Sequence, residues 1–214
     1  MGFELRRRNG RLELAALHHP RYGAICADWT SPEVRRRVAG GRRQLLGKAV
    51  GLPKHPDPAV LDATAGLGRD GFVLAALGAR VTLVERNDTV AALLADARLR
   101  ALADATTAEA AGRTEIVCAD ARNLMVPDPG ARFDVIYLDP MYPGRKAALA
   151  GKELQLLREL AGADDDANAL LAPALANARR RVVVKRPLKA PALAGRAPSL
   201  AFTGSQARFD VYLT

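Results

Sequence analysis

The sequence predicts an α/β fold in which a doubly wound, mostly parallel sheet carries helices on its two faces. From about residue 58 onward, short apolar runs rich in β-branched residues alternate with longer helical patterns. Such runs are typical of buried parallel strands, because a parallel connection needs a crossover of a dozen or more residues. The last two runs are separated only by a short stretch around Gly204, which predicts a C-terminal antiparallel hairpin and seven strands in all.

The expected elements follow from these patterns in chain order. Five parallel strands are expected at 59–61, 81–84, 115–118, 135–138 and 182–184, and the hairpin at 199–203 and 208–213. Helices are expected near 70–78, 88–104, 146–160 and 166–179. In open sheets of this kind, ligands bind beyond the carboxyl ends of the strands, so functional residues should follow each run directly.

Charge divides the chain into two parts. Residues 1–58 hold 12 Lys and Arg against 5 Asp and Glu, which accounts for most of the net charge of +9. Arginine clusters suit contact with nucleic-acid phosphates, although a solvated basic face would give the same pattern. We therefore expect a basic N-terminal segment over 1–57 that contacts RNA, and a Rossmann-like domain over 58–214. The clustered cations of the first part are Arg6, Arg7, Arg8, Arg35, Arg36, Arg37, Arg42, Arg43 and Lys48.

Several classes of site lack support in the sequence. Cys26 and Cys118 lie far apart without CxxC spacing, which argues against a disulfide framework or a cysteine zinc site. His18 and His19 have no acidic or cysteine partner at ligand spacing, so we expect surface histidines and no metal. No apolar run is long enough for a signal peptide or a membrane span, which favours a soluble, cytoplasmic protein. Trp29 is expected to pack in the core, with base stacking as the alternative.

A glycine-rich loop follows the first predicted strand. Gly66, Gly68 and Gly71 form a G-x-G-x-x-G pattern that permits a tight turn and close approach of the backbone to a ligand. Glu85 ends the second strand, where an acid can accept hydrogen bonds from ribose hydroxyls. The combination predicts a nucleoside-cofactor site, either for a nicotinamide or flavin nucleotide or for S-adenosylmethionine. A structural turn with a surface glutamate is the simpler alternative.

Acidic residues around this loop favour S-adenosylmethionine. Asp62 ends the first strand, where it suits a cationic or amino-bearing ligand better than a pyrophosphate. Arg69 and Asp70 follow the loop, and Asp70 lies where it can cap the helix and meet a positive amino group. A further contact, to adenine, is expected from Asp120-Ala121-Arg122 after the third strand.

The loop after the fourth strand predicts chemistry on an exocyclic amine. Asp139, Pro140 and Tyr142 follow an apolar strand in a proline-stiffened loop. The Asp139 carboxylate and the Pro140 carbonyl can accept the amine hydrogens, while the Tyr142 ring holds a base in position. These three residues are the candidate catalytic group. The alternative is a plain strand end with a surface tyrosine.

Four segments together carry a resemblance to a known family. They are 61–70 (LDATAGLGRD), 83–87 (LVERN), 137–143 (YLDPMYP) and 182–187 (VVVKRP). The chain, from about Gly23 to its end, strongly resembles the bacterial small-subunit ribosomal RNA methyltransferase J family. That resemblance implies a class I, Rossmann-like enzyme that uses S-adenosylmethionine to make N2-methylguanosine near the 3′ end of 16S ribosomal RNA.

The resemblance also implies roles for particular residues. Arg69, Asp70, Glu85 and Arg86 would line the cofactor site together with 120–122, and Asp139 would close it near the reactive methyl group. Longer family members carry more residues before the basic segment, so we expect this chain to bind ribosomal RNA, or the 30S subunit, differently from them or to act on a related site.

Three alternatives stay open at this point. They are a methyltransferase that acts on an exocyclic amine of another RNA or DNA base, a nucleotide-dependent oxidoreductase and a catalytically silent RNA-binding protein with the same fold. Lys185 and Arg186, at the end of the fifth strand, are candidates for a substrate phosphate, with simple solvation equally compatible. The oligomeric state is not predicted.

Overall fold

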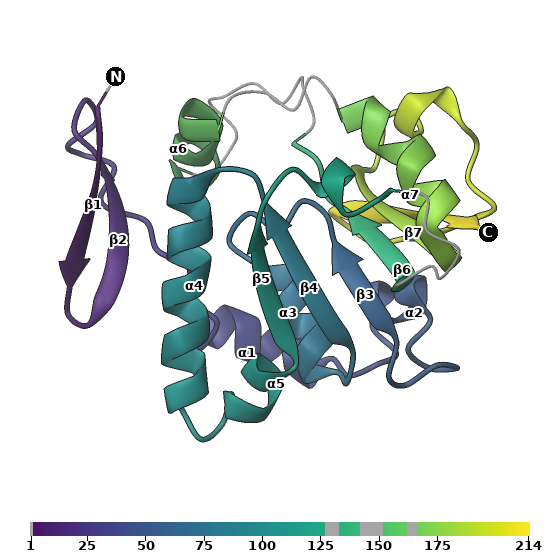
Figure 1. The fold of residues 1–214 in the computed structure, drawn as a ribbon, viewed down its shortest axis with the longest axis horizontal. Helices are drawn as coiled ribbons and strands as arrows, with labels where there is room; N and C mark the ends of the chain where they lie inside the picture. Colours follow the sequence, from purple (N-terminus) through teal and green to yellow (C-terminus); the bar gives the residue numbers. More distant parts are fainter. Residues whose placement is uncertain (1, 127–132, 142–151, 162–166) are drawn as a thin grey trace.

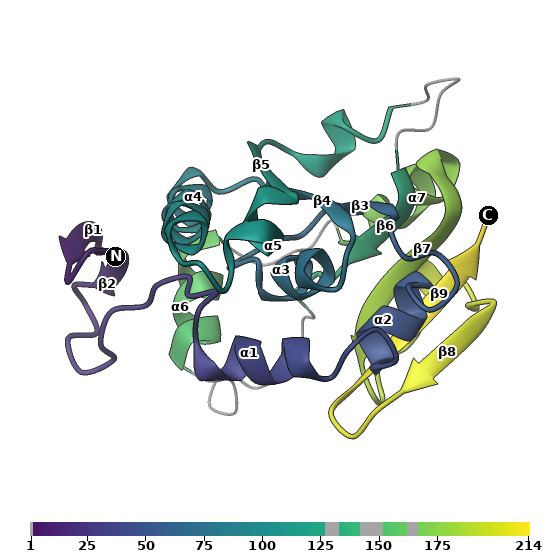
Figure 2. The ribbon, with the colours of Figure 1, turned by 90° about the horizontal axis from the view of Figure 1, so that it is seen from below.

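The computed structural model describes residues 2–126, 133–141, 152–161 and 167–214. Its main sheet has seven strands in the order β5-β4-β3-β6-β7-β9-β8, and only β9 runs against the others. Figure 1 labels β3 to β7, and Figure 2 labels β8 and β9. The strands are β3 (Ala59–Asp62), β4 (Arg80–Glu85), β5 (Thr114–Cys118), β6 (Phe133–Leu138), β7 (Ala178–Pro187), β8 (Leu200–Thr203) and β9 (Ala207–Leu213). The expected sheet and its C-terminal hairpin are confirmed.

Alternation along the strands gives the sheet two apolar faces. Val60 and Val135 point into one hydrophobic core, whereas their neighbours Leu61 and Ile136 point into a second. The larger core is covered by α1 to α5 with part of α6, and α7 with short 3-10 turns covers the other. Figure 2 shows α1, α2 and α3 along one side of the sheet. The helices are α1 (Pro32–Ala39), α2 (Leu45–Val50), α3 (Arg69–Ala76), α4 (Asp88–Ala103), α5 (Ala108–Gly112), α6 (Lys152–Ala161) and α7 (Leu171–Asn177).

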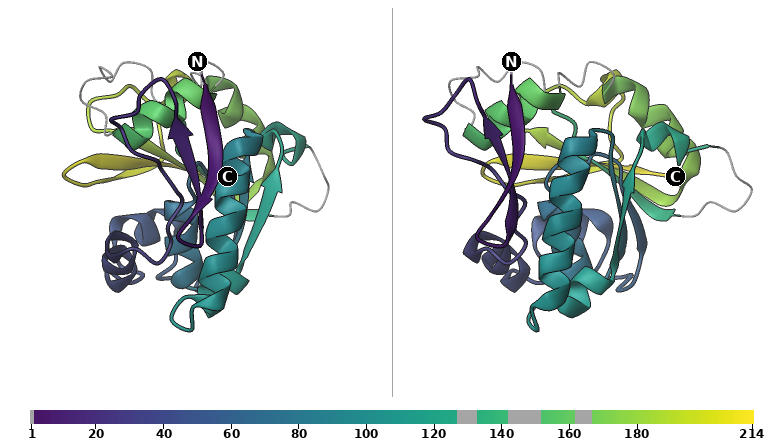
Figure 3. Two further views of the ribbon diagram at one scale, coloured as in Figure 1. Left: turned by 90° about the vertical axis from the view of Figure 1, so that its left-hand side faces the viewer. Right: turned by 60° about the vertical axis from the view of Figure 1, so that its left-hand side comes forward.

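An N-terminal hairpin lies beside α4, outside the main sheet. Strands β1 (Phe3–Arg8) and β2 (Arg11–Ala16) pair around Asn9 and Gly10, whose φ angles of 50° and 75° suit a two-residue hairpin turn. Figure 3 shows the hairpin along the outer side of α4 in two views. The buried Asp96 of α4 holds it by accepting hydrogen bonds from the Leu12 amide and the Arg7 guanidinium.

The rest of the N-terminal segment packs into the larger core. Trp29 is fully buried, its ring stacks on Phe72, and its indole N–H donates to the Leu67 carbonyl at 3.0 Å. Helix α1 begins with Ser31, whose hydroxyl accepts from the Val34 amide, followed by Pro32 at the first helical position. Residues 1–57 therefore include part of the same hydrophobic core as the sheet.

The structure adds elements to those expected and confirms the packing interpretation of Trp29. Helices α3, α4 and α7 fall within a few residues of the predicted ranges, and α6 matches the later part of its range. The hairpin β1–β2 and helices α1, α2 and α5 were not predicted. Residues 146–151 of the predicted third helix lie outside the described residues. Among the described residues, no helix has the length and apolarity needed to cross a membrane.

Candidate active site

A cavity of about 360 Å³ opens at the carboxyl ends of the central strands, a volume typical of small-molecule sites. The chain runs outward from β3 through β4 to β5 on one side, and β6 and β7 lie on the other. The cavity thus lies where the strand order reverses, as the rule for open α/β sheets predicts. It is lined by both the glycine loop after β3 and Asp139 after β6.

The glycine loop is shaped from below by the core. Gly68 has a φ of 73°, and a Cβ atom there would lie 2.6 Å from Leu94 and 2.9 Å from Trp29. Gly66 has a φ of 53°, but a Cβ atom on it would meet nothing within 4 Å. The loop backbone at Gly68 therefore packs so closely on Trp29 and Leu94 that a larger residue would not fit there. At Gly66 the space beside the backbone is open, so a ligand can approach the backbone closely.

Glu85 joins the end of β4 to this loop. Its carboxylate accepts hydrogen bonds from the Gly66 amide at 3.0 Å and from the Asn87 amide at 2.8 Å. Each carboxylate oxygen can accept more than one hydrogen bond, so these two contacts do not prevent Glu85 from also accepting from a ligand. Glu85 lines the cavity beside Arg86, in the position expected for an acid that meets ribose hydroxyls.

Asp62 is a buried carboxylate at the floor of the cavity. Among the described residues, its side chain accepts one hydrogen bond, from the Thr64 amide at 3.3 Å, and Asp62 is 2% exposed. Burial, and then the nearby Asp70 carboxylate, raise the pKa of Asp62 well above its usual range. A cationic group arriving in the cavity would relieve that unfavourable burial of charge.

Asp70, in the first turn of α3, instead accepts hydrogen bonds from three donors of this chain. It accepts from the Tyr137 hydroxyl at 2.6 Å, from Lys185 Nζ at 2.9 Å and from the Arg37 guanidinium. Burial alone would raise the pKa of Asp70, but Lys185 and Arg37 hold it well below its usual range. Asp70 lines the cavity, and its carboxylate fixes the positions of the Tyr137, Lys185 and Arg37 side chains.

Lys185 links Asp70 to Asp139. The strands β6 and β7 are in register at Leu138 and Val184, so the next residues, Asp139 and Lys185, are neighbours. Lys185 Nζ lies 2.8 Å from Asp139 Oδ2, while the Asp139 amide donates to the Thr64 hydroxyl at 2.6 Å. Burial raises the pKa of Asp139, and Lys185 opposes that effect.

The other predicted site residues fall in three groups. Arg69 lines the cavity and makes a two-pronged ion pair with Glu153 of α6, at 2.6 and 2.7 Å. Asp120 and Ala121 also line it, whereas the Arg122 guanidinium turns onto the Asp120 carboxylate. Pro140 is buried beside Asp139, and Tyr142 lies outside the described residues.

The structure adds residues that the sequence did not assign to the cavity. Arg37 and Glu33 reach it from α1, and Tyr137 reaches it from β6. Lys185 and Arg186, considered for a phosphate, are engaged within the protein: Lys185 bridges two carboxylates and the buried Arg186 donates to the Pro191 carbonyl. Tyr137 and Lys185 belong to quoted motifs, but only the fold reveals their shared partner Asp70.

The charges of the cavity favour a cationic ligand over a pyrophosphate. Its lining includes seven carboxylates and four basic side chains. A dinucleotide would add negative charge beside Asp62, whereas a sulfonium with an amino group adds positive charge. The open space over Gly66, the acceptors of Glu85 and the buried Asp62 carboxylate fit S-adenosylmethionine. The fold and this cavity define a class I, S-adenosylmethionine-dependent methyltransferase.

Comparisons with known proteins agree with that class. The family model "Putative SAM-dependent methyltransferase" matches residues 1–214. The chain is 48% identical to the ribosomal RNA small subunit methyltransferase J of Aliivibrio fischeri, over 95% of this chain and 83% of that protein. It is 54% identical to the protein of the same name from Thioalkalivibrio sulfidiphilus, over 90% and 77%. The chain belongs to the ribosomal RNA small subunit methyltransferase J family.

A solved structure supports the same fold. The SAM-dependent methyltransferase NGO1261 from Neisseria gonorrhoeae superposes with a TM-score of 0.78 at 36% identity. The match covers 99% of this chain and 83% of that one. Dependence on S-adenosylmethionine excludes the oxidoreductase considered from the glycine loop alone.

Proposed function

We propose that this protein transfers a methyl group from S-adenosylmethionine to the 2-amino group of a guanine in 16S ribosomal RNA. The observation that carries the proposal is the shared cavity: the glycine loop, Glu85 and Asp139 come from three strand ends and line one space. The relatives are named as ribosomal RNA methyltransferases, which is the reason to propose ribosomal RNA as the substrate. The loop after β6 supplies the reason to expect an amine as acceptor.

We assign the cofactor contacts by comparing the hydrogen bonds that each carboxylate already accepts within the protein. Asp70 already accepts three hydrogen bonds from this chain, whereas Asp62 accepts one from the described residues, so we assign the amino group of the cofactor to Asp62. Glu85 accepts from the ribose hydroxyls while it holds the Gly66 amide. Asp120 and Ala121 border the adenine end, and Arg69, fixed by Glu153, forms part of the wall.

Asp139 and Lys185 carry the chemistry on the acceptor. Bound S-adenosylmethionine supplies an electrophilic methyl group, whose carbon–sulfur bond breaks as the carbon–nitrogen bond forms. Asp139 accepts a hydrogen bond from the guanine amine, which favours the pyramidal attacking form, and the methylated amine then releases one proton to water. Lys185 holds the Asp139 carboxylate in place and ionised. The Pro140 carbonyl and the Tyr142 ring are proposed to complete the grip on the base.

Binding of RNA is proposed for the basic residues around the cavity mouth. Several arginines of the N-terminal segment are used within the protein, since Arg7 pairs with Asp96 and Arg37 with Asp70. Arg36 and Lys189 are exposed and have no acidic partner among the residues that the structure describes. Lys189 follows β7, at the carboxyl edge of the sheet, and Arg36 precedes Arg37, which lines the cavity. These two exposed cations suit RNA phosphates. A ribosomal RNA substrate is also the reason to propose a cytoplasmic location.

Nucleoside mapping tests the whole proposal. The purified protein, methyl-labelled S-adenosylmethionine and 30S subunits or deproteinised 16S RNA from a strain lacking the homologous gene are combined, and digested nucleosides are identified by mass spectrometry. N2-methylguanosine at one position of 16S RNA is the expected product. Label in another methylated base would replace the guanine assignment. Tight RNA binding without label in either substrate would favour the silent RNA-binding protein.

A further inference from the structure

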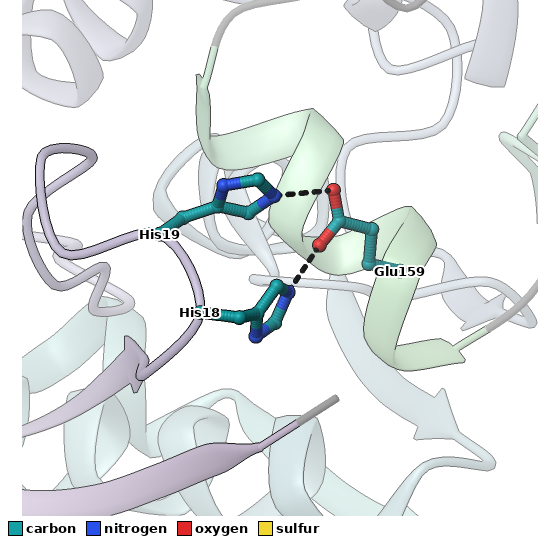
Figure 4. Close-up of side chains that lie close together, drawn as sticks. All are labelled: His18, His19 and Glu159. Carbon is teal, nitrogen blue, oxygen red and sulfur yellow. Dashed lines mark hydrogen bonds and ion pairs between the residues drawn. The ribbon is translucent and has the colours of Figure 1, made fainter.

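Two histidines and a glutamate meet at a point outside the cofactor cavity. His18 and His19 follow β2, and Glu159 lies on α6 (Figure 4). His18 Nε2 lies 2.9 Å from Glu159 Oε2, and His19 Nε2 lies 3.5 Å from Glu159 Oε1. One donor atom from each residue falls within 4.8 Å of the others. The sequence offered no acid at ligand spacing, but folding brings one from 141 residues away.

The hydrogen bonds of His18 imply a cation at this point. His18 Nδ1 lies 3.1 Å from the Gly2 carbonyl oxygen, which only an N–H can satisfy. In the neutral ring, Nε2 then carries a lone pair, and that lone pair faces a carboxylate oxygen. Two acceptors at this distance repel unless a proton or a metal ion lies between them. Metal-binding histidines usually donate their second ring nitrogen to a carbonyl or carboxylate in this way.

Aromatic neighbours hold the two imidazoles in place. The His19 ring stacks on Tyr22, with centroids 4.6 Å apart and planes at 12°. The His18 ring meets the edge of Phe3 at 5.2 Å. The three ligand side chains are 25%, 37% and 30% exposed, so an ion could enter while one coordination position stays open to water. Preorganised rings and partial exposure suit a metal site better than a freely moving surface pair.

We propose that His18, His19 and Glu159 form a zinc site that clamps the N-terminal hairpin to α6. Two imidazole nitrogens and a carboxylate are a ligand set that zinc accepts, with water as the fourth ligand. The hairpin side of the clamp is anchored on α4, and the α6 side carries Glu153, which holds Arg69 at the cavity wall. Zinc at this point therefore stiffens one wall of the cofactor cavity and takes no part in methyl transfer.

Metal titration of the untagged protein tests the site. After dialysis against a chelator, Zn²⁺ is titrated by calorimetry and Co²⁺ by its visible absorption, in wild type, His19→Ala, Glu159→Gln and His55→Ala. We expect one ion per chain in wild type and in His55→Ala, with the visible bands of four-coordinate cobalt. His19→Ala and Glu159→Gln should lose affinity about tenfold or more, because loss of even a residue that only supports a ligand typically costs about 10- to 100-fold. Retained S-adenosylmethionine binding shows that each variant is folded.

Thermal unfolding gives a second readout that is independent of methyl transfer. Zn²⁺ should raise the Tm of wild type and of His55→Ala, and should leave that of His19→Ala nearly unchanged. Absence of zinc uptake by wild type would overturn the proposal and leave a simple imidazolium–carboxylate pair. Uptake that His19→Ala and Glu159→Gln do not weaken would also overturn it, because the ion would then lie elsewhere.

Discussion

Lys185 Nζ lies 2.8 Å from Asp139 Oδ2 and 2.9 Å from Asp70 Oδ2. One ammonium group therefore joins Asp139, in the loop after β6, to Asp70, in the first turn of α3. Burial lowers the pKa of a lysine, yet the two carboxylates raise that of Lys185 above its usual range. The ammonium group is therefore a permanent charge at neutral pH. It couples the proposed cofactor and acceptor sides of the cavity.

Replacement of Lys185 by Met should change the pH dependence of the reaction. Lys185 opposes the effect of burial on Asp139, so its loss raises the pKa of Asp139 further. The ionised carboxylate is the proposed hydrogen-bond acceptor, so the acid limb of the kcat profile should move to higher pH. At pH values on that limb, kcat should fall about tenfold for each unit by which the pKa of Asp139 rises. Lys54→Met, at an exposed position after α2, is the control. A lower kcat with an unmoved profile would show that Lys185 acts on packing alone.

Asp139 itself should be essential for turnover. Asp139→Ala removes the acceptor for the amine hydrogens, and we expect kcat to fall by about 10²- to 10⁴-fold. Asp139→Asn should recover part of that loss, because its carbonyl oxygen still accepts one hydrogen bond. Calorimetry should show S-adenosylmethionine binding by each variant. Full activity of Asp139→Ala would remove the proposed role.

The ribose contact can be tested at Glu85. Glu85→Gln replaces charge-assisted hydrogen bonds with neutral ones and weakens the hold on Gly66, so the Kd for S-adenosylmethionine should rise about 10- to 100-fold. Glu109→Gln, on the exposed face of α5, changes the net charge equally and should bind normally. An unchanged Kd in Glu85→Gln would mean that the cofactor does not use this acid.

Charge reversal can locate the RNA surface. The double variant Arg36→Glu with Lys189→Glu reverses the charge of the two cations proposed to bind RNA. The matched variant Arg43→Glu with Arg179→Glu reverses two charges at the amino edge of the sheet. All four side chains are exposed. The first pair should weaken binding to ribosomal RNA and reduce the salt slope by about 2, because two phosphate contacts are lost. Equal weakening by the second pair would indicate binding by net charge rather than by Arg36 and Lys189.

The sequence predicts the sheet and many cavity residues for a simple physical reason. A buried parallel strand is a short apolar run, and its carboxyl end is an edge where ligands bind, so Asp62, Glu85 and Asp139 can be placed without coordinates. The hairpin at Asn9-Gly10 carried a recognisable turn signal, but its charged strands lack the clear alternation that identifies a half-buried strand.

Other features depend on distances that a sequence does not contain. Lys185 meets Asp139 because of the register between β6 and β7, and Arg37 reaches Asp70 because α1 packs beside α3. The partner of His18 lies 141 residues away on α6. Motifs therefore predict which residues end each strand, whereas the pairing of charges across elements follows from packing.

The attachment of the N-terminal hairpin should depend on Asp96 of α4. Its carboxylate is nearly buried and accepts from Arg7 at 2.9 Å, Arg100 at 2.8 Å and the Leu12 amide at 3.1 Å. Asp96→Ala removes all three hydrogen bonds, and because both guanidinium groups can still reach water, we expect a loss of about 1–3 kcal/mol in the free energy of unfolding, measured by urea denaturation.

The pH dependence of stability gives a sharper test of the same residue. Burial would raise the pKa of Asp96, but hydrogen bonds from Arg100, Leu12 and Arg7 lower it below its usual range. A carboxyl group with a lowered folded-state pKa stabilises the fold fully above its unfolded pKa of about 3.9, and that contribution is lost as the pH falls through the folded value. The difference in stability between wild type and Asp96→Asn should therefore shrink as the pH falls from about 5 toward 3. If the difference in the free energy of unfolding stays constant over this range, the negative charge of Asp96 does not contribute to holding the hairpin.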